Sequence, residues 1–513
     1  MEKTMTLATA FTAIAVGMFM FWLLKRRRKL RFFKDLGIPG PEPDFIWGNL
    51  KQMDHRRIEA CVQWRNKYGK VFGIYVGSEP FLIITDVQMA QECFVKQATI
   101  FQDRPVGFVD AEPFKSSIFQ LGGNAWKYVR ARLNYGFSSG TIKELYEKMN
   151  LCAARFVERI SSISQTRGYV EVDDHSLDFS FDIAVNTVLA QQVKKSKGGC
   201  EDPILESLKQ VIKDMENAAI EVAFTVPVLR ALLTLIYPLT KHARAFRYVM
   251  NHVQNTLKLH RSGKLPREPS VLQAILDEQI GTHNGPQHKS KRRGKYLDDN
   301  YMSSNAAIFL LAGTETTSSV LSFLMYLLAR SPGEQEKVVK EMDRVLSSEK
   351  ADDLRFDQLR DLKRVDMVIH ECLRLYPPVP LHLVRRCSRD TTVCGQFIPA
   401  GVNVIVTPWL IHRDPDYWPD PERFIPDRFA EECSESHRKE AYMPFGLGPR
   451  ICIGQKLAFT AIKLALVKVL QKFQLTLRNE ATGSPTLSVP SVILVPAGGV
   501  TIRLERRLGR TVA

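Results

Sequence analysis

The sequence predicts a mainly α-helical protein with small β-sheets, built as a single large domain on an N-terminal transmembrane anchor. Three observations predict this class. Residues 4–24 are apolar and uncharged, residues 140–280 carry apolar side chains at helical spacing, and short β-rich runs lie near both ends of the remaining chain. Residues 44–513 contain neither an internal repeat nor a clean linker, so one domain with a large core suits a chain of 513 residues.

The first thirty residues predict the anchor. The run from Thr4 to Leu24 is 21 residues long, and a helix of that length spans roughly 30 Å, the thickness of a bilayer's hydrocarbon core. Phe21 and Trp22 suit the membrane interface, and the basic run KRRRKLR begins at Lys25. A cleaved signal peptide would carry its positive charge before a shorter apolar run. We therefore expect a single-pass anchor with the rest of the chain facing the cytosol.

A basic and proline-rich connector follows at residues 25–43. Its GIPGPEP stretch, residues 37–43, predicts a stiff, extended chain that cannot continue the preceding helix. The basic run can lie against anionic headgroups and supplies part of the net charge of +16. Because the chain has neither zinc-finger spacing nor an aromatic–basic signature, this charge predicts a membrane surface or an acidic protein partner and no nucleic acid.

The N-terminal part of the domain is expected to open with a β-hairpin. Residues 70–85 hold two β-rich runs around a Gly-Ser-Glu-Pro turn, and Asp86 can cap a helix that runs to about residue 94. Residues 220–239 are apolar enough to resemble a second membrane span, but Glu221, Arg230 and two prolines argue against one. We expect short surface helices there that touch the membrane.

The C-terminal half predicts two long helices and a small sheet. A polar, basic loop at 281–295 precedes a helix that opens at Leu297-Asp-Asp and continues through Ala329. A second helix is expected from about residue 453 to 473. Short β-runs at 492–495 and 500–504 follow around a Pro-Ala-Gly-Gly turn.

The most unusual stretch is PFGLGPRICIGQ, residues 444–455. Nine cysteines are scattered through the chain without regular spacing, which does not fit a disulfide framework. Cys452 could pack in the core, form a disulfide, bind a metal or act as a nucleophile. A nucleophile needs a partnering histidine, and zinc needs further cysteines or histidines nearby, which this stretch does not provide.

An iron held in a flat macrocycle would explain the composition of this stretch. A thiolate ligand needs N–H donors and the positive end of a following helix, and a helix is expected to follow at once. Gly446, Gly448 and Gly454 would keep side chains away from the macrocycle. Arg450 can pair with an anionic propionate, and Phe445 would keep water from the thiolate.

Residues 445–454 resemble the haem-ligand signature F-x-x-G-x-R-x-C-x-G of the cytochrome P450 family at every fixed position. The resemblance extends over nearly the whole chain and looks closest to the drug-metabolising family 3 and thromboxane-synthase branch. It implies that Cys452 is the axial thiolate ligand of a haem b iron. It further implies a monooxygenase of the endoplasmic reticulum membrane that inserts one oxygen atom of O2 into a lipophilic substrate. Electrons would come from NADPH through NADPH-cytochrome P450 reductase, with cytochrome b5 as a further candidate partner.

The same resemblance assigns partners for the haem propionates. Trp126 and Arg130 lie four residues apart in AWKYVR, so they share one helix face. In LVRRCSRD, Arg385 is ranked before its neighbour Arg386 as another propionate partner. Lys127, together with Arg132 and Lys143, could form a basic face toward an acidic flavin domain, although such charges also occur on ordinary solvated surfaces.

The AGTETT stretch, residues 312–317, resembles the oxygen-activating segment of the family. Ala312 would leave room for dioxygen, and Glu315 and Thr316 form an acid–alcohol pair able to relay protons. By these residues alone, a polar patch on an exposed helix would be the favoured interpretation, and the cysteine motif favours the relay instead. The segment keeps the threonine that the rearranging thromboxane synthases lack, which favours a monooxygenase. An isomerase or dehydratase with the same haem, and a non-catalytic haem carrier or gas sensor, remain as alternatives.

Two further expectations follow from the resemblance. Glu371 and Arg374 in ECLR, with Arg423 in PERF, would form a buried ion network that braces the haem side of the fold. The substrate pocket would draw on residues 104–123, 205–245, 309–316, 379–383 and the C-terminal hairpin. The apolar residues in these stretches, which predict a lipophilic substrate, include Phe108, Phe114, Ile118, Phe119, Leu311 and Leu381.

Overall fold

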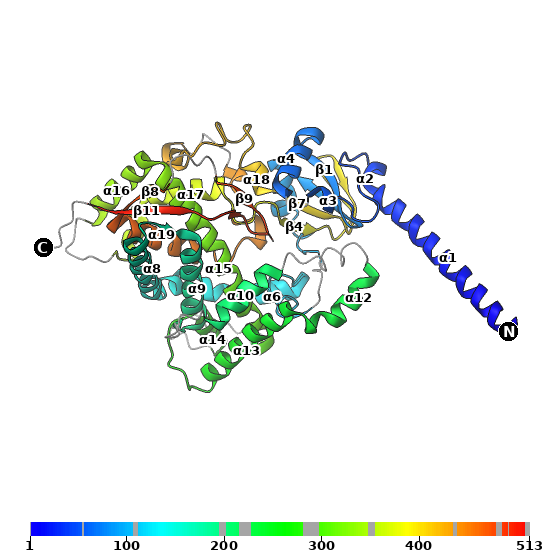
Figure 1. The fold of residues 1–513 in the computed structure, drawn as a ribbon, viewed down its shortest axis with the longest axis horizontal. Coiled ribbons are helices and arrows are strands. Elements are labelled where there is room, and N and C mark those ends of the chain that lie inside the picture. The colour runs from blue at the N-terminus through cyan, green and yellow to red at the C-terminus, as the bar shows by residue number, and fades with distance from the viewer. Residues whose placement is uncertain are drawn as a thin grey trace. The chain divides into compact units, whose positions relative to one another are not determined.

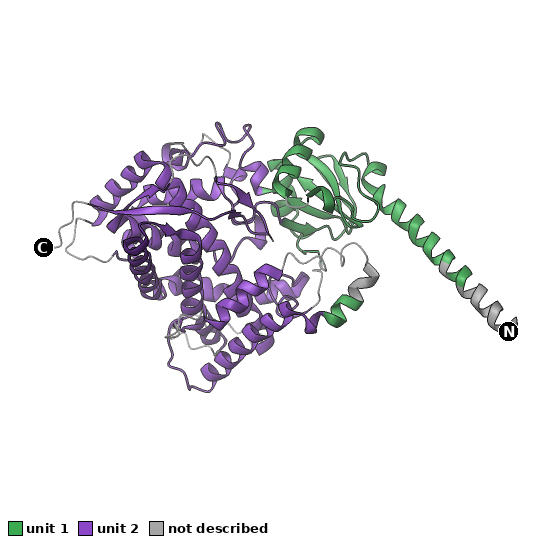
Figure 2. Ribbon diagram, in the orientation of Figure 1, with its two compact units in different colours: residues 1–109, 217–236, 383–407 green, residues 110–216, 237–382, 408–513 purple. Residues whose placement is uncertain are grey.

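The computed structural model describes residues 2–53, 56–105, 111–193, 202–214, 227–280, 297–346, 354–433, 439–478, 485–490 and 492–507. The chain divides into two compact units, each assembled from three separate stretches of sequence (Figure 2). Unit 1 comprises residues 1–109, 217–236 and 383–407, and unit 2 comprises residues 110–216, 237–382 and 408–513. Because segments far apart in the sequence complete each unit, the chain has no single point at which it could be cut into two domains.

Unit 1 is built around a four-stranded sheet with the order β1-β2-β7-β4 (Figure 1). β1 (Val71–Val76) and β2 (Glu79–Ile84) form the predicted hairpin. β7 (Asn403–Val406) pairs in parallel with β2, and β4 (Leu383–Arg386) pairs antiparallel with β7. The other elements of this unit are α1 (Glu2–Leu30), α2 (Phe32–Asp35), α3 (Leu50–Met53), α4 (Arg57–Tyr68), α5 (Val87–Gln91), η1 (Glu92–Lys96), α12 (Pro227–Ile236), β5 (Thr391–Val393) and β6 (Gln396–Ile398).

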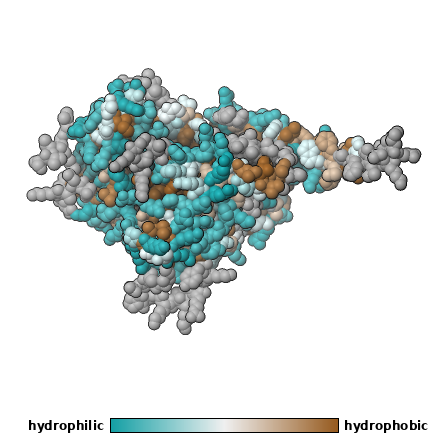
Figure 3. All heavy atoms as spheres, turned by 60° about the horizontal axis from the view of Figure 1, so that its bottom comes forward, coloured by the Kyte–Doolittle hydropathy of each residue, from teal (hydrophilic) through white to brown (hydrophobic). Residues whose placement is uncertain are grey.

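The helix expected at the N-terminus is present as α1, and its apolar side chains are exposed. Figure 3 shows hydrophobic surface along the part of this helix that is coloured. The side chains that are exposed by 53–68% are Ile14, Val16, Met18, Phe19, Met20, Phe21 and Leu24. The basic run that follows is partly packed: Arg26 is only 4% exposed, and its guanidinium donates to the carbonyl oxygens of Phe45 and Ile46. The C-terminal end of α1 is therefore attached to the loop that precedes α3.

The proline-rich connector is packed against β1. Gly73 N–H donates to the carbonyl of Pro39 at 2.8 Å. A Cβ added to Gly73 would lie 2.3 Å from a ring carbon of Phe33, which is 3% exposed. Only glycine admits this ring so close to the strand, so the sequence of β1 accommodates the connector.

Unit 2 is mainly helical and surrounds the long helix α15 (Asp299–Arg330) (Figure 1). Asp298 caps this helix by accepting the N–H of Tyr301 at 2.9 Å, close to the predicted start. The other α-helices are α6 (Gly123–Leu133), α7 (Ser139–Glu144), α8 (Tyr146–Arg167), α9 (Val172–Leu189), α10 (Pro203–Asp214), α13 (Lys241–Arg261), α14 (Val271–Ile280), α16 (Pro332–Leu346), α17 (Lys363–Leu375), α18 (Pro408–Ile411) and α19 (Gln455–Lys472).

Short helices and two small sheets complete unit 2. β11 (Thr501–Arg506) lies between β3 (Val170–Glu171) and β8 (Phe473–Leu477), and β9 (Leu487–Ser488) pairs with β10 (Val495–Pro496). The β-run expected at 492–495 therefore extends only over its last residue, whereas the run at 500–504 is confirmed. The short helices are η2 (Asn134–Phe137), η3 (Tyr237–Leu239), η4 (Asp357–Asp361), η5 (Pro426–Phe429), η6 (Glu431–Cys433), η7 (Lys439–Ala441) and η8 (Gly448–Arg450).

Other expectations concern residues 220–239, the loop at 281–295 and Phe108. Within the described part of the 220–239 stretch, the chain forms the short helices α12 and η3, and Leu232 and Leu235 on α12 are 53% and 76% exposed. The loop at 281–295 and Phe108 lie outside the described residues. Among the helices described, α15 is long and apolar enough to cross a membrane, but 72% of its most apolar window is buried within the protein.

Candidate haem-thiolate site

The cysteine loop lies between η7 and α19 in unit 2. Gly446 and Gly448 adopt φ angles of 84° and 67°, a left-handed backbone that glycine adopts without strain. The loop folds back so that the N–H of Cys452 donates to the carbonyl of Phe445 at 2.9 Å. Cys452 is exposed and stands three residues before the first residue of α19. The partial positive charge at the start of this helix favours the thiolate form of a cysteine so placed.

Arg450 connects this loop to the segment that precedes α6. Its guanidinium lies 4.3 Å from the centre of the Trp126 ring and donates to the carbonyls of Ile118 at 2.9 Å and Leu121 at 2.5 Å. The side chain is only 7% exposed. Two residues that were predicted separately as propionate partners, Trp126 and Arg450, are therefore in direct contact. Such a buried, multiply bonded arginine holds the loop in one position.

Arg130 is the second predicted residue of α6 near the cysteine. Its Nε donates to Oδ1 of Asn134 at 3.0 Å. Partial burial lowers the pKa of Arg130, and the interaction with Cys452 acts in the opposite direction. The positive charge of Arg130 in turn favours the thiolate form of Cys452.

In the middle of α15, the predicted oxygen-activating stretch interrupts a run of buried residues, and its turn around Ala312 is called the exposed turn below. Ala312 is exposed, whereas the helix residues from 302 to 308 and from 317 to 329 are buried. The hydroxyl of Thr316 donates to the carbonyl of Ala312 at 2.6 Å. Burial raises the pKa of Glu315 to about 7, so this carboxyl can both hold and release a proton near neutral pH.

Phe137 links the cysteine loop to α15. Its ring stands edge-on to that of Phe309, one helical turn before Ala312, with 4.9 Å between centres. A Cβ added to Gly454 would lie 3.8 Å from the same Phe137 ring. Phe309 of α15 and Gly454, at the end of the cysteine loop, therefore both lie close to one aromatic side chain.

This donor set fits haem. Among the residues that the structure describes, no group of three or more histidine, cysteine, aspartate or glutamate side chains could hold a metal ion. A single cysteine thiolate as the protein's ligand to iron is typical of haem-thiolate proteins, in which the macrocycle supplies the other ligands. The cationic side chains of Arg130 and Arg450 beside the cysteine suit the anionic propionates of such a group.

Arg385 belongs to unit 1, where its side chain is 3% exposed. Its guanidinium lies 5.0 Å from the centre of the Phe94 ring, and Nη1 donates to the carbonyl of Val384 at 2.7 Å. Arg386 is exposed, and its N–H donates to the carbonyl of Asp103 at 2.7 Å. The contact of Arg385 with a propionate, and its ranking before Arg386, stay predictions.

The buried ion network contains two of the three predicted residues. Glu371 and Arg374 are fully buried and form two hydrogen bonds of 2.8 Å. The prediction of Arg423 is wrong, because its side chain is 73% exposed and pairs with Asp420. Arg423 contributes only its backbone carbonyl, which accepts from Arg374 at 3.1 Å. Arg428 takes the third place, with its Nε 3.4 Å from Oε1 of Glu371.

Sequence reasoning also missed His412. This side chain is fully buried, and its Nε2 accepts the N–H of Met443 at 3.0 Å, just before the cysteine loop. Burial lowers the pKa of His412 to about 3, so it stays neutral and can accept this bond. A lone histidine in IHRDP carries no pattern that would have revealed the contact.

The fold and this site together define a haem-thiolate protein. A profile of the family "Cytochrome P450" matches residues 38–503, and the chain belongs to that family as an oxidoreductase, a monooxygenase that takes a small-molecule substrate and a redox partner. Human cytochrome P450 3A7 is 33% identical over 470 residues, covering 90% of this chain and 89% of the relative. Human cytochrome P450 3A5 is 32% identical over 506 residues, covering 97% and 96%. Cytochrome P450 3A13 of Mus musculus is 32% identical over 451 residues, covering 86% of each.

Proposed function

We propose that this chain is a monooxygenase anchored in the endoplasmic reticulum membrane, which inserts one atom of O2 into lipophilic compounds. In this proposal NADPH supplies the electrons through a flavoprotein reductase. The observation that carries the proposal is the exposed Cys452 in a glycine-bent loop that shares Phe137 with the exposed turn of α15. A reactive centre held by the cysteine would have the acid–alcohol pair of α15 beside it.

In this proposal the cofactor is haem b, and several residues hold it. Cys452 ligates the iron, and Gly446, Gly454 and Phe445 shape the loop behind it. The candidate partners of the propionates are Trp126, Arg130, Arg385 and Arg450. When bound, haem supplies the binding and reductive activation of dioxygen, which no side chain of this protein could perform.

The protein's own contribution to the reaction is proton delivery. Since the pKa of Glu315 is about 7, about half of these carboxyls carry a proton at neutral pH. The Thr316 hydroxyl rests against the Ala312 carbonyl, and a turn about its side-chain bond would direct its proton to the exposed side of the helix. Glu315 can then replace that proton, because an alcohol can accept one proton while it donates another.

An apolar cluster beside α15 supports a lipophilic substrate. Phe114 packs edge-on against Phe246 at 5.2 Å and against Phe119 at 5.9 Å between ring centres. Leu311 of α15 packs against the same cluster, next to Ala312. Apolar side chains this close to the exposed turn would bury an apolar compound where the oxygen chemistry takes place.

The membrane and the redox partner enter through the surface of the protein. The exposed apolar side chains of α1, followed by the basic run from Lys25, support a membrane-spanning helix with its C-terminal end on the cytosolic side. Lys127 is exposed on α6, and Lys143 is exposed on α7. The guanidinium carbon of Arg132 lies 4.5 Å from the centre of the Tyr128 ring. Such charges would steer an acidic flavin domain, with cytochrome b5 as a further partner.

One experiment tests this proposal against its rivals. Haem-loaded protein is reconstituted with a reductase, NADPH and isotopically heavy dioxygen, and is offered a broad set of lipophilic compounds. We expect products that carry one heavy oxygen atom, that vanish in Cys452→Ser and that fall in Thr316→Ala. Well-loaded protein that makes no labelled product, yet rearranges hydroperoxides without NADPH, would show an isomerase instead.

A further inference from the structure

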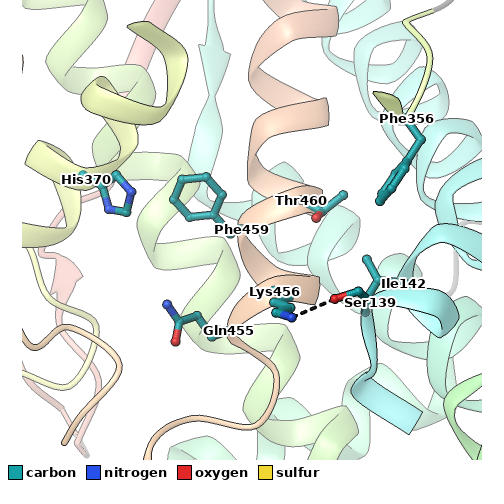
Figure 4. A pocket seen from close by; sticks show the side chains of 8 residues that line it. All are labelled: Ser139, Ile142, Phe356, His370, Gln455, Lys456, Phe459 and Thr460. Atoms are coloured by element: carbon teal, nitrogen blue, oxygen red, sulfur yellow. Dashed lines mark hydrogen bonds between the residues drawn. The ribbon is translucent and has the colours of Figure 1, made fainter. Parts of the chain in front are cut away.

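A pocket of about 350 Å³ opens on unit 2. It lies between α7, the loop before η4, α17 and the first two turns of α19 (Figure 4). Its volume is in the range of small-molecule sites. The residues that line it are Ser139, Ile142, Phe356, His370, Gln455, Lys456, Phe459 and Thr460. None of these residues has been given a role in the proposed reaction.

One wall of the pocket is aromatic and fixed by its neighbours. The His370 ring lies 4.9 Å from the Phe459 ring and 5.4 Å from that of Phe429, centre to centre. Nδ1 of His370 and the hydroxyl of Tyr442 are 2.8 Å apart. Burial lowers the pKa of His370 to about 4, so this ring is neutral at physiological pH. A wall packed in this way presents flat apolar surface without reorganising, which lowers the entropic cost of binding.

The rim of the pocket is polar and positively charged. Figure 4 shows Gln455, Lys456 and Ser139 together at one end, with the rings of His370, Phe459 and Phe356 toward the other. Nζ of Lys456 donates to Oγ of Ser139 at 2.8 Å. Among the residues that the structure describes, Lys456 has no carboxylate partner, and the pocket lining contains no acidic residue. The rim therefore offers a positive charge and a hydroxyl at one end of an aromatic surface.

We propose that this pocket is a binding site for a small arylalkanoic acid, with the carboxylate at Lys456 and Ser139 and the aryl ring against Phe459. A carboxylate accepts charge-assisted hydrogen bonds from the ammonium, which are stronger than those an uncharged group would make. The aryl ring would replace water on the aromatic wall, and contacts between aromatic rings are attractive. A cationic ligand would lose the charge-assisted hydrogen bonds, because the charge of Lys456 would repel it.

A matched pair of ligands tests the charge. The probes are 4-phenylbutyrate and its neutral amide, titrated by calorimetry into full-length haem-loaded protein whose iron is saturated with an azole inhibitor. We expect one site per chain with the acid bound about tenfold more tightly than the amide, since a charge-assisted bond contributes about that factor in Kd. Equal affinity of the two probes, or no heat at millimolar concentration, would overturn the proposal.

Three variants locate the site. Lys456→Gln should reduce the affinity for the acid to that for the amide, and Thr460→Phe should abolish binding of both by filling the pocket. Lys472→Gln, the same change at an exposed position in the last turn of α19, should leave both affinities unchanged. Each variant is first checked for an unaltered haem spectrum. Acid binding that survives Lys456→Gln overturns the site. So would a Lys456→Gln effect seen only on reductase affinity, because the lysine would then serve a protein partner.

Discussion

The buried ion network allows a graded test of the corrected assignment. Three arginines are changed to methionine, which keeps a long, apolar side chain but removes the charge: Arg374, Arg428 and Arg423. Arg374 is fully buried and makes both hydrogen bonds to Glu371, as well as three to backbone carbonyls. Its loss leaves the buried Glu371 carboxylate without its main partner, and removing one member of a buried pair costs about 3–5 kcal/mol.

Arg428→Met should have a smaller effect. Its Nε lies 3.4 Å from Glu371 and makes no hydrogen bond among the described residues, although Nη2 donates to the carbonyl of Asp420 at 2.8 Å. Burial lowers the pKa of Arg428, so part of its attraction to Glu371 is offset by the cost of removing its charge from water. Since Glu371 keeps Arg374, we expect a loss of about 1–3 kcal/mol, the cost when a polar group loses its hydrogen-bond partner, here the carbonyl of Asp420.

Arg423→Met is the control, because its side chain is 73% exposed and its carbonyl survives the change. We expect its effect to stay within about 0.5 kcal/mol, as for most surface substitutions. The assay is urea unfolding of the haem-loaded protein, followed by tryptophan fluorescence and by the haem spectrum. The expected order of midpoints is wild type and Arg423→Met together, then Arg428→Met, then Arg374→Met. A midpoint for Arg423→Met below that of Arg428→Met would refute the assignment of Arg428 as the third member.

Three further predictions concern single positions. Burial raises the pKa of Glu315 from 4.5 to about 7, so stability that is present below pH 4.5 is lost as the pH rises to 7. Glu315→Gln should remove this pH dependence, so that at pH 8 the variant is more stable than wild type by up to about 3 kcal/mol, and it should slow oxygenation. Urea midpoints of both proteins at pH 5 and pH 8 measure the effect on stability. The same change in midpoint between the two pH values for wild type and variant would contradict it. Gly73→Ala should destabilise unit 1 by about 1–3 kcal/mol, because the new Cβ overlaps the ring of Phe33. Proteolytic cleavage within residues 36–44 should then become faster. An unchanged cleavage rate would show that the connector is not held against Gly73. His412→Ala leaves the buried N–H of Met443 without its acceptor, at a cost of about 1–3 kcal/mol. On heating, the variant should therefore lose haem at a lower temperature than wild type. Loss at the same temperature would show that this hydrogen bond does not support the cysteine loop.

The sequence predicted those parts of the fold and site that depend on local chemistry. Asp86 and Asp298 cap helices because each has a carboxylate three residues before an available N–H. The hairpin at 70–85 followed from its turn and β-rich runs. The cysteine loop was recognisable because its glycines, arginine and cysteine stand at fixed spacing within ten residues.

What the sequence could not provide were choices between equivalent residues at long range. PERF and PDRF, residues 421–424 and 426–429, each place an arginine before a phenylalanine, and only packing decides between them. In the structure, Phe429 joins the aromatic cluster of His370 and Tyr442, and this draws Arg428 inward. The contact of Arg450 with Trp126 joins residues 324 positions apart, a distance over which local patterns carry no signal.

The attachment of α1 has a mechanical consequence for a chain held in a bilayer. Arg26 is bonded to the carbonyls of Phe45 and Ile46, and Phe33 and Pro39 are packed on Gly73. Because α1 is joined to unit 1 in this way, a change in the tilt of the helix would be passed to the sheet of unit 1 instead of being absorbed by a flexible hinge. A thicker or thinner membrane, which changes the tilt of a spanning helix, would then turn the whole of unit 1 with it. If α1 spans the membrane, lipid composition would thus influence the orientation of unit 1 through the tilt of this helix.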